Sequence, residues 1–201
     1  QVDTDGKKAD IRLKISKDLS PEAYRLTVDA DGVSVEAGGP AGAFYALQSV
    51  RLAIQPQDKT GIPRMYVADR PRFGYRGLMV DVSRYFVEKE ELMKIIDCMS
   101  VLKLNKLHLH LTDDNGWRLE IKKYPRLTSV GAWRVNQTDR PFPDRRNPEP
   151  GEPTPIGGYY TQEDMKEIIR YAAGRCIEII PEIDMPGHSN AALAAYPELA
   201  C

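Results

Sequence analysis

The sequence predicts an α/β protein in two parts, a small α+β domain over residues 1–70 and a series of parallel strand–helix units over residues 71–201. In the first part, apolar residues alternate with polar ones and then change to a helical spacing. In the second part, short apolar runs alternate with amphipathic helical segments, and long crossovers of this kind join parallel strands. The two patterns meet in a predicted linker over residues 56–71, which is rich in proline and glycine.

The first part is expected to be a meander of strands over residues 10–36 with one buried face, to which Ile11, Leu13 and Ile15 contribute. Residues 40–54 then place apolar side chains at helical intervals, with a proline at the start of the segment. We therefore predict an antiparallel sheet and one helix.

The second part is expected to alternate strands and helices in a fixed order. The order is strand 78–80, helix 88–102, strand 106–111, helix 161–172 and strand 176–183. Thr161 is predicted to cap the second helix, because its side chain can accept from the backbone while Asp164 reaches back. The loop over residues 139–158 holds six of the 15 prolines, and such long loops are usually functional or disordered.

Charge and composition argue against two classes of partner. With 28 Lys and Arg against 29 Asp and Glu, the net charge of −1 lacks the basic surplus that binds nucleic acid. No apolar run reaches the roughly 20 residues that cross a bilayer, so no membrane span is expected.

The start at Gln1 has neither an initiator Met nor a signal-peptide core, which is typical of a processed or trimmed chain. Cys98, Cys176 and Cys201 lie far apart and predict no disulfide framework or zinc knuckle, and the first two are expected to be buried thiols.

Polar, ionisable residues follow each of the three predicted parallel strands. They are Asp81 and Arg84 after the first strand, His110, Asp113, Asp114 and Trp117 after the second, and Glu182, Asp184 and His188 after the third. The carboxyl ends of parallel strands open on one face, so residues about a hundred positions apart should converge there. The sequence therefore predicts a pocket at this face.

Taken one at a time, these residues have structural alternatives. Asp81 and Arg84 could form a salt bridge at the start of a helix, residues 113–116 could be a turn, His188 could cap the next helix, and Trp117 could lie in the core. Their coincidence at three strand ends favours a functional site. Arg and Asp hold sugar hydroxyls by charge-assisted hydrogen bonds, an Asp–His pair fixes a tautomer, and a Trp offers an apolar face to a pyranose ring.

Long motifs carry a family resemblance. Residues 76–86 (RGLMVDVSRYF), 104–118 (LNKLHLHLTDDNGWR) and 181–188 (PEIDMPGH) closely resemble the start of the catalytic barrel of glycoside hydrolase family 20, the β-N-acetylhexosaminidases. Residues 42–48 and 158–161 also fit that family. The resemblance covers nearly the whole chain, and its motifs occur in the family's order.

The resemblance implies a small α+β domain before a TIM barrel, of which this truncated chain would hold the first three strand–helix units. It implies a retaining enzyme that removes terminal N-acetylhexosamine from β-linked glycans, with no cofactor and no metal. In this family the 2-acetamido group of the sugar attacks the anomeric carbon, so no enzyme nucleophile is required. The family also suggests a secreted, periplasmic or lysosomal location.

The resemblance assigns roles to particular residues. Arg84 resembles the arginine that holds hydroxyls of the terminal sugar, and Asp113 and His188 resemble the supporting pair beside the catalytic acid. Asp184 would lie behind that histidine. Arg84 and Asp184 are the predicted substrate-binding residues, together with Trp117, which is included for the apolar face of its side chain and not for the resemblance. The family's catalytic Asp-Glu pair follows the fourth barrel strand, and this chain ends after the third. We therefore expect a fragment that is inactive alone and whose open sheet edges lead to self-association.

Two other hypotheses fit the sequence. A metal-dependent TIM-barrel hydrolase would use His108, His110 and an Asp as ligands, since the two histidines point to the same side of one strand. A non-catalytic glycan-binding fragment would keep Arg84, Asp184 and Trp117 but lack most of the pocket. Metal analysis and an assay with a β-N-acetylglucosaminide distinguish these hypotheses from the first.

Overall fold

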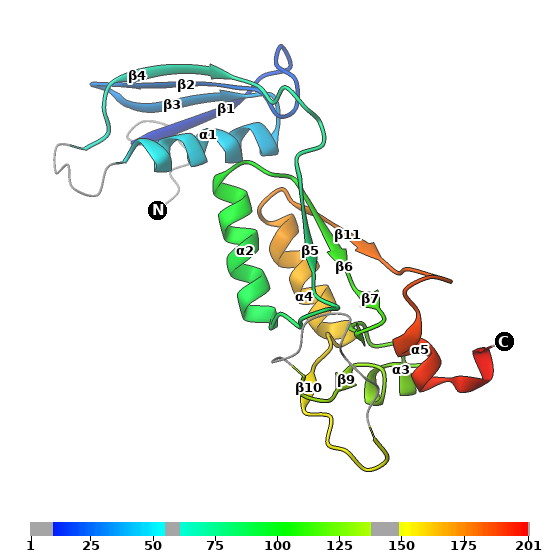
Figure 1. Cartoon of the computed structure of the whole chain (residues 1–201). Helices are drawn as coiled ribbons and strands as arrows, with labels where there is room; N and C mark the ends of the chain where they lie inside the picture. The colour runs from blue at the N-terminus through cyan, green and yellow to red at the C-terminus, as the bar shows by residue number, and fades with distance from the viewer. Residues whose placement is uncertain (1–9, 55–60, 138–148, 201) are drawn as a thin grey trace. The chain divides into compact units, whose positions relative to one another are not determined.

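The computed structural model describes residues 10–54, 61–137 and 149–200, so Cys201 and the first half of the predicted proline-rich loop, residues 139–148, lie outside the described residues. The chain divides into two compact units, residues 1–76 with 98–105, and residues 77–97 with 106–201. Figure 1 labels the helices and strands in chain order. Within the described ranges, no helix is both long and apolar enough to cross a membrane.

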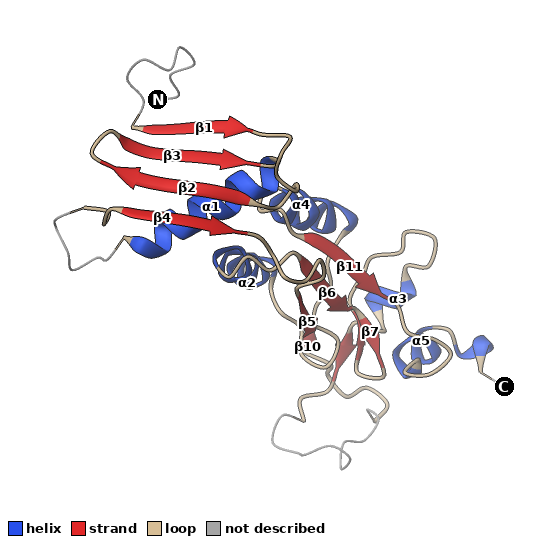
Figure 2. Cartoon of the chain, turned by 90° about the horizontal axis from the view of Figure 1, so that it is seen from above, coloured by secondary structure: helices blue, strands red, loops and turns tan. Residues whose placement is uncertain are grey.

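The first unit contains a four-stranded sheet with the strand order β1-β3-β2-β4. Helix α1 lies along one face of this sheet (Figure 2). Strand β2 pairs antiparallel with both β3 and β4, whereas β1 runs parallel to β3. The elements are β1 Ile11–Ile15, β2 Tyr24–Asp29, β3 Gly32–Ala37, α1 Pro40–Ala53 and β4 Met65–Asp69.

Two sequence predictions for this sheet are wrong. The strands do not form a simple meander, because β1 joins β3 in parallel at the sheet edge, and Ile11, Leu13 and Ile15 are each about half exposed. Helix α1 packs mainly on β2 and β3, so the apolar side of β1 is left uncovered. The predicted linker contains β4, a five-residue edge strand placed between Pro63 and Pro71. Prolines are tolerated beside such a strand, and they concealed it in the sequence.

Helix α1 buries only part of the face that its predicted apolar spacing indicates, because Val50 is buried and Leu47 is not. Leu47 is exposed, and the buried residues of the helix are Gly42, Ala43, Tyr45, Ala46, Gln48 and Val50. A Cβ atom at Gly42 would lie 2.4 Å from the carbonyl oxygen of Ala23. At Gly42 the helix therefore approaches the neighbouring backbone too closely for any side chain.

The second unit is built on a parallel sheet with the strand order β11-β6-β5, which confirms the predicted parallel arrangement. Helices α2 and α4 lie side by side on one face of these strands (Figure 1), where Lys89 Nζ donates to Asp164 at 2.8 Å and Tyr171 donates to Asp97. The elements are β5 Gly77–Asp81, α2 Lys89–Val101, β6 Lys106–His110, α4 Gln162–Ala173 and β11 Glu178–Glu182.

Shorter elements surround the carboxyl ends of these strands. They are β7 Thr112–Asp113, β8 Gly116–Trp117, α3 Arg126–Ser129, β9 Trp133–Arg134, β10 Ile156–Gly157, α5 Asn190–Ala195 and the 3-10 helix η1 Pro197–Leu199. On α2, Leu92, Ile96 and Met99 form the buried face, as their spacing predicts. The expected burial of Cys98 is wrong, because the helix turns this residue away from that face and exposes it, while Cys176 is half-buried.

Candidate active site

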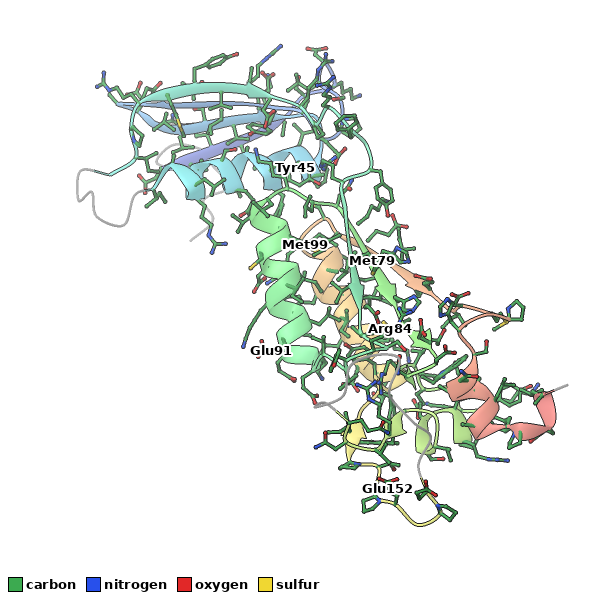
Figure 3. All side chains as sticks on the ribbon, in the orientation of Figure 1. Tyr45, Met79, Arg84, Glu91, Met99 and Glu152 are labelled. Atoms are coloured by element: carbon green, nitrogen blue, oxygen red, sulfur yellow. The ribbon has the colours of Figure 1, made fainter. Side chains whose placement is uncertain are left out.

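The three parallel strands end at the same level, and the last residue of each strand has an ionisable side chain. In the sheet register Asp81 pairs with His110, and His110 pairs with Glu182. Figure 3 labels Arg84, which follows β5 and lies among the side chains at this end of the sheet. The convergence that the sequence predicts is therefore present.

Asp113, at the end of β7, is the most buried ionisable residue of this group, with a side chain 2% exposed. Its Oδ2 lies 2.6 Å from Arg84 Nη2 and 2.7 Å from His110 Nε2. Its Oδ1 accepts from the backbone N–H of Asp114 at 2.7 Å and lies 3.2 Å from His188 Nδ1. Burial alone would raise the pKa of Asp113, but these donors and the Arg84 charge hold it below its usual value.

Arg84 joins two carboxylates at the end of β5. Its Nη1 donates to Asp81 Oδ2 at 2.8 Å, and the backbone N–H groups of Ser83 and Arg84 donate to Asp81 Oδ1 at 3.0 Å. The Asp81–Arg84 salt bridge therefore exists, but it does not start a helix, because α2 begins only at Lys89. The Arg84 side chain is 35% exposed, so part of the guanidinium still faces solvent.

Glu182 holds both histidines of β6. Its Oε2 lies 2.6 Å from His108 Nε2, and its Oε1 lies 3.0 Å from His110 Nδ1. Both histidines thus point to the same side of the strand, as the sequence predicts. The sequence marked Glu182 as a strand-end residue, but only the structure shows that it connects this pair.

The geometry does not favour a metal centre at these residues. His108 and His110 are occupied by Glu182 rather than grouped with an Asp around an open position. Within the described part of the chain, potential ligand atoms of Asp113, Asp114 and His188 come within 4.8 Å of one another. However, the Arg84 guanidinium already occupies Asp113 Oδ2, and a divalent cation beside it would face a fixed positive charge.

The segment after β11 contributes His188 and Asp184 in different ways. The His188 side chain is 51% exposed and reaches Asp113. The backbone N–H of Asp184 donates to Thr112 Oγ1 at 2.9 Å, which fixes this segment to β7. Among the described residues, the Asp184 carboxylate makes no hydrogen bond with His188, so it does not support the histidine in this arrangement.

Trp117 is a core residue and not an open platform for a sugar ring. It is 8% exposed, and its indole Nε1–H donates to the carbonyl oxygen of Leu119 at 2.7 Å. Leu127, Ala191 and Ala195 complete the buried cluster around it. The substrate-binding role predicted for Trp117 is corrected, because α5 and the residues after β8 cover its faces.

Arg118, which the sequence did not indicate as important, connects several backbone segments near the site. Its side chain is almost fully buried and donates to backbone carbonyl oxygens in four separate segments. The acceptors are the carbonyls of Val82, Ser83, Asn115, Ala132 and Gly158. Burial lowers the pKa of Arg118 to about 10. Because Val82 and Ser83 immediately precede Arg84, this guanidinium fixes the backbone that presents Arg84 to Asp113.

The fold and the site together define an enzyme-type α/β domain, with a charged, hydrogen-bonded cluster where parallel strands end. Residues 73–201 match the family model described as "Glycosyl hydrolase family 20, catalytic domain", and residues 1–70 match that family's domain 2. The chain therefore belongs to glycosyl hydrolase family 20. The predicted fold class, a small α+β domain followed by part of a parallel catalytic domain, is confirmed.

Curated relatives of this chain are named as beta-hexosaminidases. A beta-hexosaminidase from Porphyromonas gingivalis is 43% identical over 191 residues, which is 91% of this chain and 23% of the relative. A beta-hexosaminidase from Akkermansia muciniphila is 44% identical over 188 residues, which is 91% of this chain and 35% of the relative. The chain thus spans only 23% and 35% of the length of these two relatives.

Solved structures agree with these relatives. A GH20 exo beta-N-acetylglucosaminidase from Vibrio harveyi, in complex with N-acetylglucosamine, has a TM-score of 0.83 at 36% identity and covers 95% of this chain and 30% of that one. A mutant Streptomyces plicatus beta-hexosaminidase in complex with its product GlcNAc has a TM-score of 0.82 at 40% identity, over 96% of this chain and 37% of that one.

Proposed function

We propose that the protein containing this chain is a retaining β-N-acetylhexosaminidase, which releases terminal N-acetylhexosamine from β-linked glycans. The observation that carries this proposal is the Arg84–Asp113–His188 cluster at the ends of parallel strands, in a chain of glycosyl hydrolase family 20. Its support is the similarity to enzymes named beta-hexosaminidase and to structures that contain N-acetylglucosamine.

The reaction proposed is substrate-assisted. The carbonyl oxygen of the sugar's 2-acetamido group attacks the anomeric carbon, and water later opens the oxazolinium-like intermediate from the same face. The protein must then provide a general acid, and other groups that orient the sugar and that acid. By family resemblance, the general acid would be a Glu that follows the fourth barrel strand, outside residues 1–201.

Within this chain, Arg84 is the proposed sugar-binding residue. It keeps N–H groups toward solvent after pairing with Asp81 and Asp113, and these can donate to hydroxyls of the terminal sugar. The two carboxylates fix the orientation of the guanidinium before substrate arrives, which reduces the entropy lost on binding.

Asp113 and His188 are the proposed supporting pair. Asp113 is held as a carboxylate and has no proton to give, so it serves as an acceptor that orients His188. The His188 side chain is 51% exposed, so the ring can approach the acid and the substrate. Asp184 is proposed as a further substrate-binding residue, because its carboxylate is not engaged by other described side chains.

The proposed reaction requires no metal ion or cofactor. We further propose that residues 1–201 alone hydrolyse hexosaminides negligibly, because they lack the general acid. The proposed location of the protein is secreted, periplasmic or lysosomal. Both rest on the family resemblance.

The Asp113→Asn variant of the intact protein tests the proposal with a chromogenic β-N-acetylglucosaminide. Because the amide cannot orient His188 in the same way as the carboxylate, we expect kcat/KM to fall by about 100-fold or more. The matched control is Asp31→Asn, at an exposed turn of the first unit, which should keep the activity. An intact protein that hydrolyses no β-N-acetylhexosaminide overturns the proposed function.

A further inference from the structure

All three histidines of the chain lie at this site, and His110 is the most buried of them. Its side chain is 8% exposed. Nδ1 lies 3.0 Å from Glu182 Oε1, and Nε2 lies 2.7 Å from Asp113 Oδ2. Each ring nitrogen of His110 therefore faces a carboxylate oxygen at hydrogen-bond distance.

Only one protonation state of His110 satisfies both contacts. A neutral imidazole has one N–H, so it can donate to one carboxylate but must turn a lone pair toward the other. The doubly protonated ring donates to both. Nε2 also lies 3.2 Å from Arg84 Nη1, from which a lone pair could accept. The contact with Asp113 is shorter, at 2.7 Å, and it needs a proton between the two atoms.

That proton does not belong to Asp113. Its Oδ2 also binds the Arg84 guanidinium at 2.6 Å, and its Oδ1 accepts the backbone N–H of Asp114. Both contacts favour the ionised carboxylate. Burial raises the pKa of Asp113 and lowers that of His110, yet their hydrogen bonds and neighbouring charges outweigh it, leaving the pKa of Asp113 below and that of His110 above its ordinary value.

Every element around His110 contributes a charged or titratable group. The groups are Asp81 at the end of β5, Arg84 after it, His108 on β6 itself, Asp113 on β7 and Glu182 on β11. Three carboxylates face a single guanidinium in this set. A cationic His110 therefore brings the cluster closer to neutrality, which a partly buried site favours.

We propose that Glu182 and His110 are positioning residues for the Asp113–His188 pair. Glu182 holds His110 as an imidazolium, His110 and Arg84 hold Asp113 as a carboxylate, and Asp113 fixes neutral His188 in the tautomer with its proton on Nδ1. The lone pair of this half-exposed ring is then on Nε2. The link to hydrolysis rests on the proposed function, whereas the protonation states follow from the contacts alone.

Nitrogen-15 NMR of the histidine rings in the intact protein measures these states directly. The signals of His108, His110 and His188 are assigned by their loss in single His→Gln variants. At pH 7 we expect both nitrogens of His110 in the protonated range, and His188, once neutral, protonated on Nδ1. A His110 ring with one protonated nitrogen at pH 7 overturns the proposal, and this measurement needs no variant of Glu182 to fold.

The Glu182→Gln variant tests the positioning role. The amide keeps the shape of the side chain but removes its charge, so the pKa of His110 should fall and the alkaline limb of the kcat/KM profile should move to lower pH. The expected loss of kcat/KM is about 10- to 100-fold, with kcat affected more than KM. Glu178→Gln is the matched control, because Glu178 is exposed on the same strand and pairs with Lys106.

The outcomes separate the two proposals. An unchanged His188 tautomer and an unchanged pH profile in Glu182→Gln overturn the positioning role. A doubly protonated His110 in a protein that hydrolyses no hexosaminide supports the His110 protonation and overturns the proposed function instead.

Discussion

Asp113 illustrates how a nearly buried carboxylate is kept charged. Donors from Arg84, His110 and the backbone of Asp114 converge on its two oxygens, and their combined effect exceeds the penalty of burial. An ionised Asp113 can orient a histidine, but it cannot protonate a leaving group. The acid of the proposed reaction must therefore be another residue.

The buried hydrogen bonds of Arg118 are expected to contribute strongly to the free energy of unfolding. A lysine can reach at most a few of the carbonyl oxygens that the guanidinium binds, so the Arg118→Lys variant should lower the free energy of unfolding by about 2–4 kcal/mol. Urea unfolding of the intact protein measures this loss. Arg12→Lys, on an exposed strand, is the control. A loss equal to that of the control would contradict the assigned role of Arg118.

The sequence predicts which residues reach the site better than what they do there. Asp81, Asp113 and Glu182 could be placed because each follows or ends an apolar strand run. The burial of Trp117 could not be predicted, since it depends on α5, which packs from more than 70 positions away. The bridge from Glu182 to both β6 histidines depends on strand register, which single-strand patterns do not reveal.

At the scale of elements, local signals succeed where both partners lie close in sequence. The capping box of α4 is confirmed, with the Thr161 side chain accepting from the backbone of Asp164 and the Asp164 carboxylate accepting from the backbone of Thr161. The edge position of β1 and the close approach of α1 to the backbone at Gly42 depend on contacts distant in sequence instead, and neither was predicted.

The start of α4 predicts a pH dependence of stability. The hydrogen bond from Lys89, with those from Thr161, lowers the pKa of Asp164 from 3.8 to about 2. A carboxyl whose pKa is lower in the folded state stabilises the fold above its unfolded pKa. The stability lost in Asp164→Asn should thus be constant above about pH 5 and shrink as pH falls from 3.8 toward 2. Thermal unfolding across this range measures it, and a difference that grows on acidification would contradict the account.

At the scale of the whole molecule, the parallel sheet has two edges within the described residues, β5 and β11. Leu78 and Met79 on β5 are exposed, at 40% and 56%. In a closed barrel both strands would have further partners, and such side chains would be covered. The exposed edges agree with a chain that spans a fraction of the length of its relatives.

A polypeptide limited to residues 1–201 should therefore self-associate. Sedimentation velocity is expected to show concentration-dependent oligomers, and Met79→Lys should reduce them because a charge on the strand edge opposes pairing. Leu52→Lys, at an exposed position of α1, is the control and should leave association unchanged. A monomer with a sharp thermal transition would contradict this expectation.

The stereochemistry of hydrolysis distinguishes substrate assistance from a single displacement by water. The intact protein is mixed with a β-N-acetylglucosaminide, and proton NMR follows the anomeric signal of the first sugar released, before mutarotation. Substrate assistance involves two inversions at the anomeric carbon, so the account predicts the β-anomer as first product. The α-anomer as first product, or no release of N-acetylglucosamine, would contradict it.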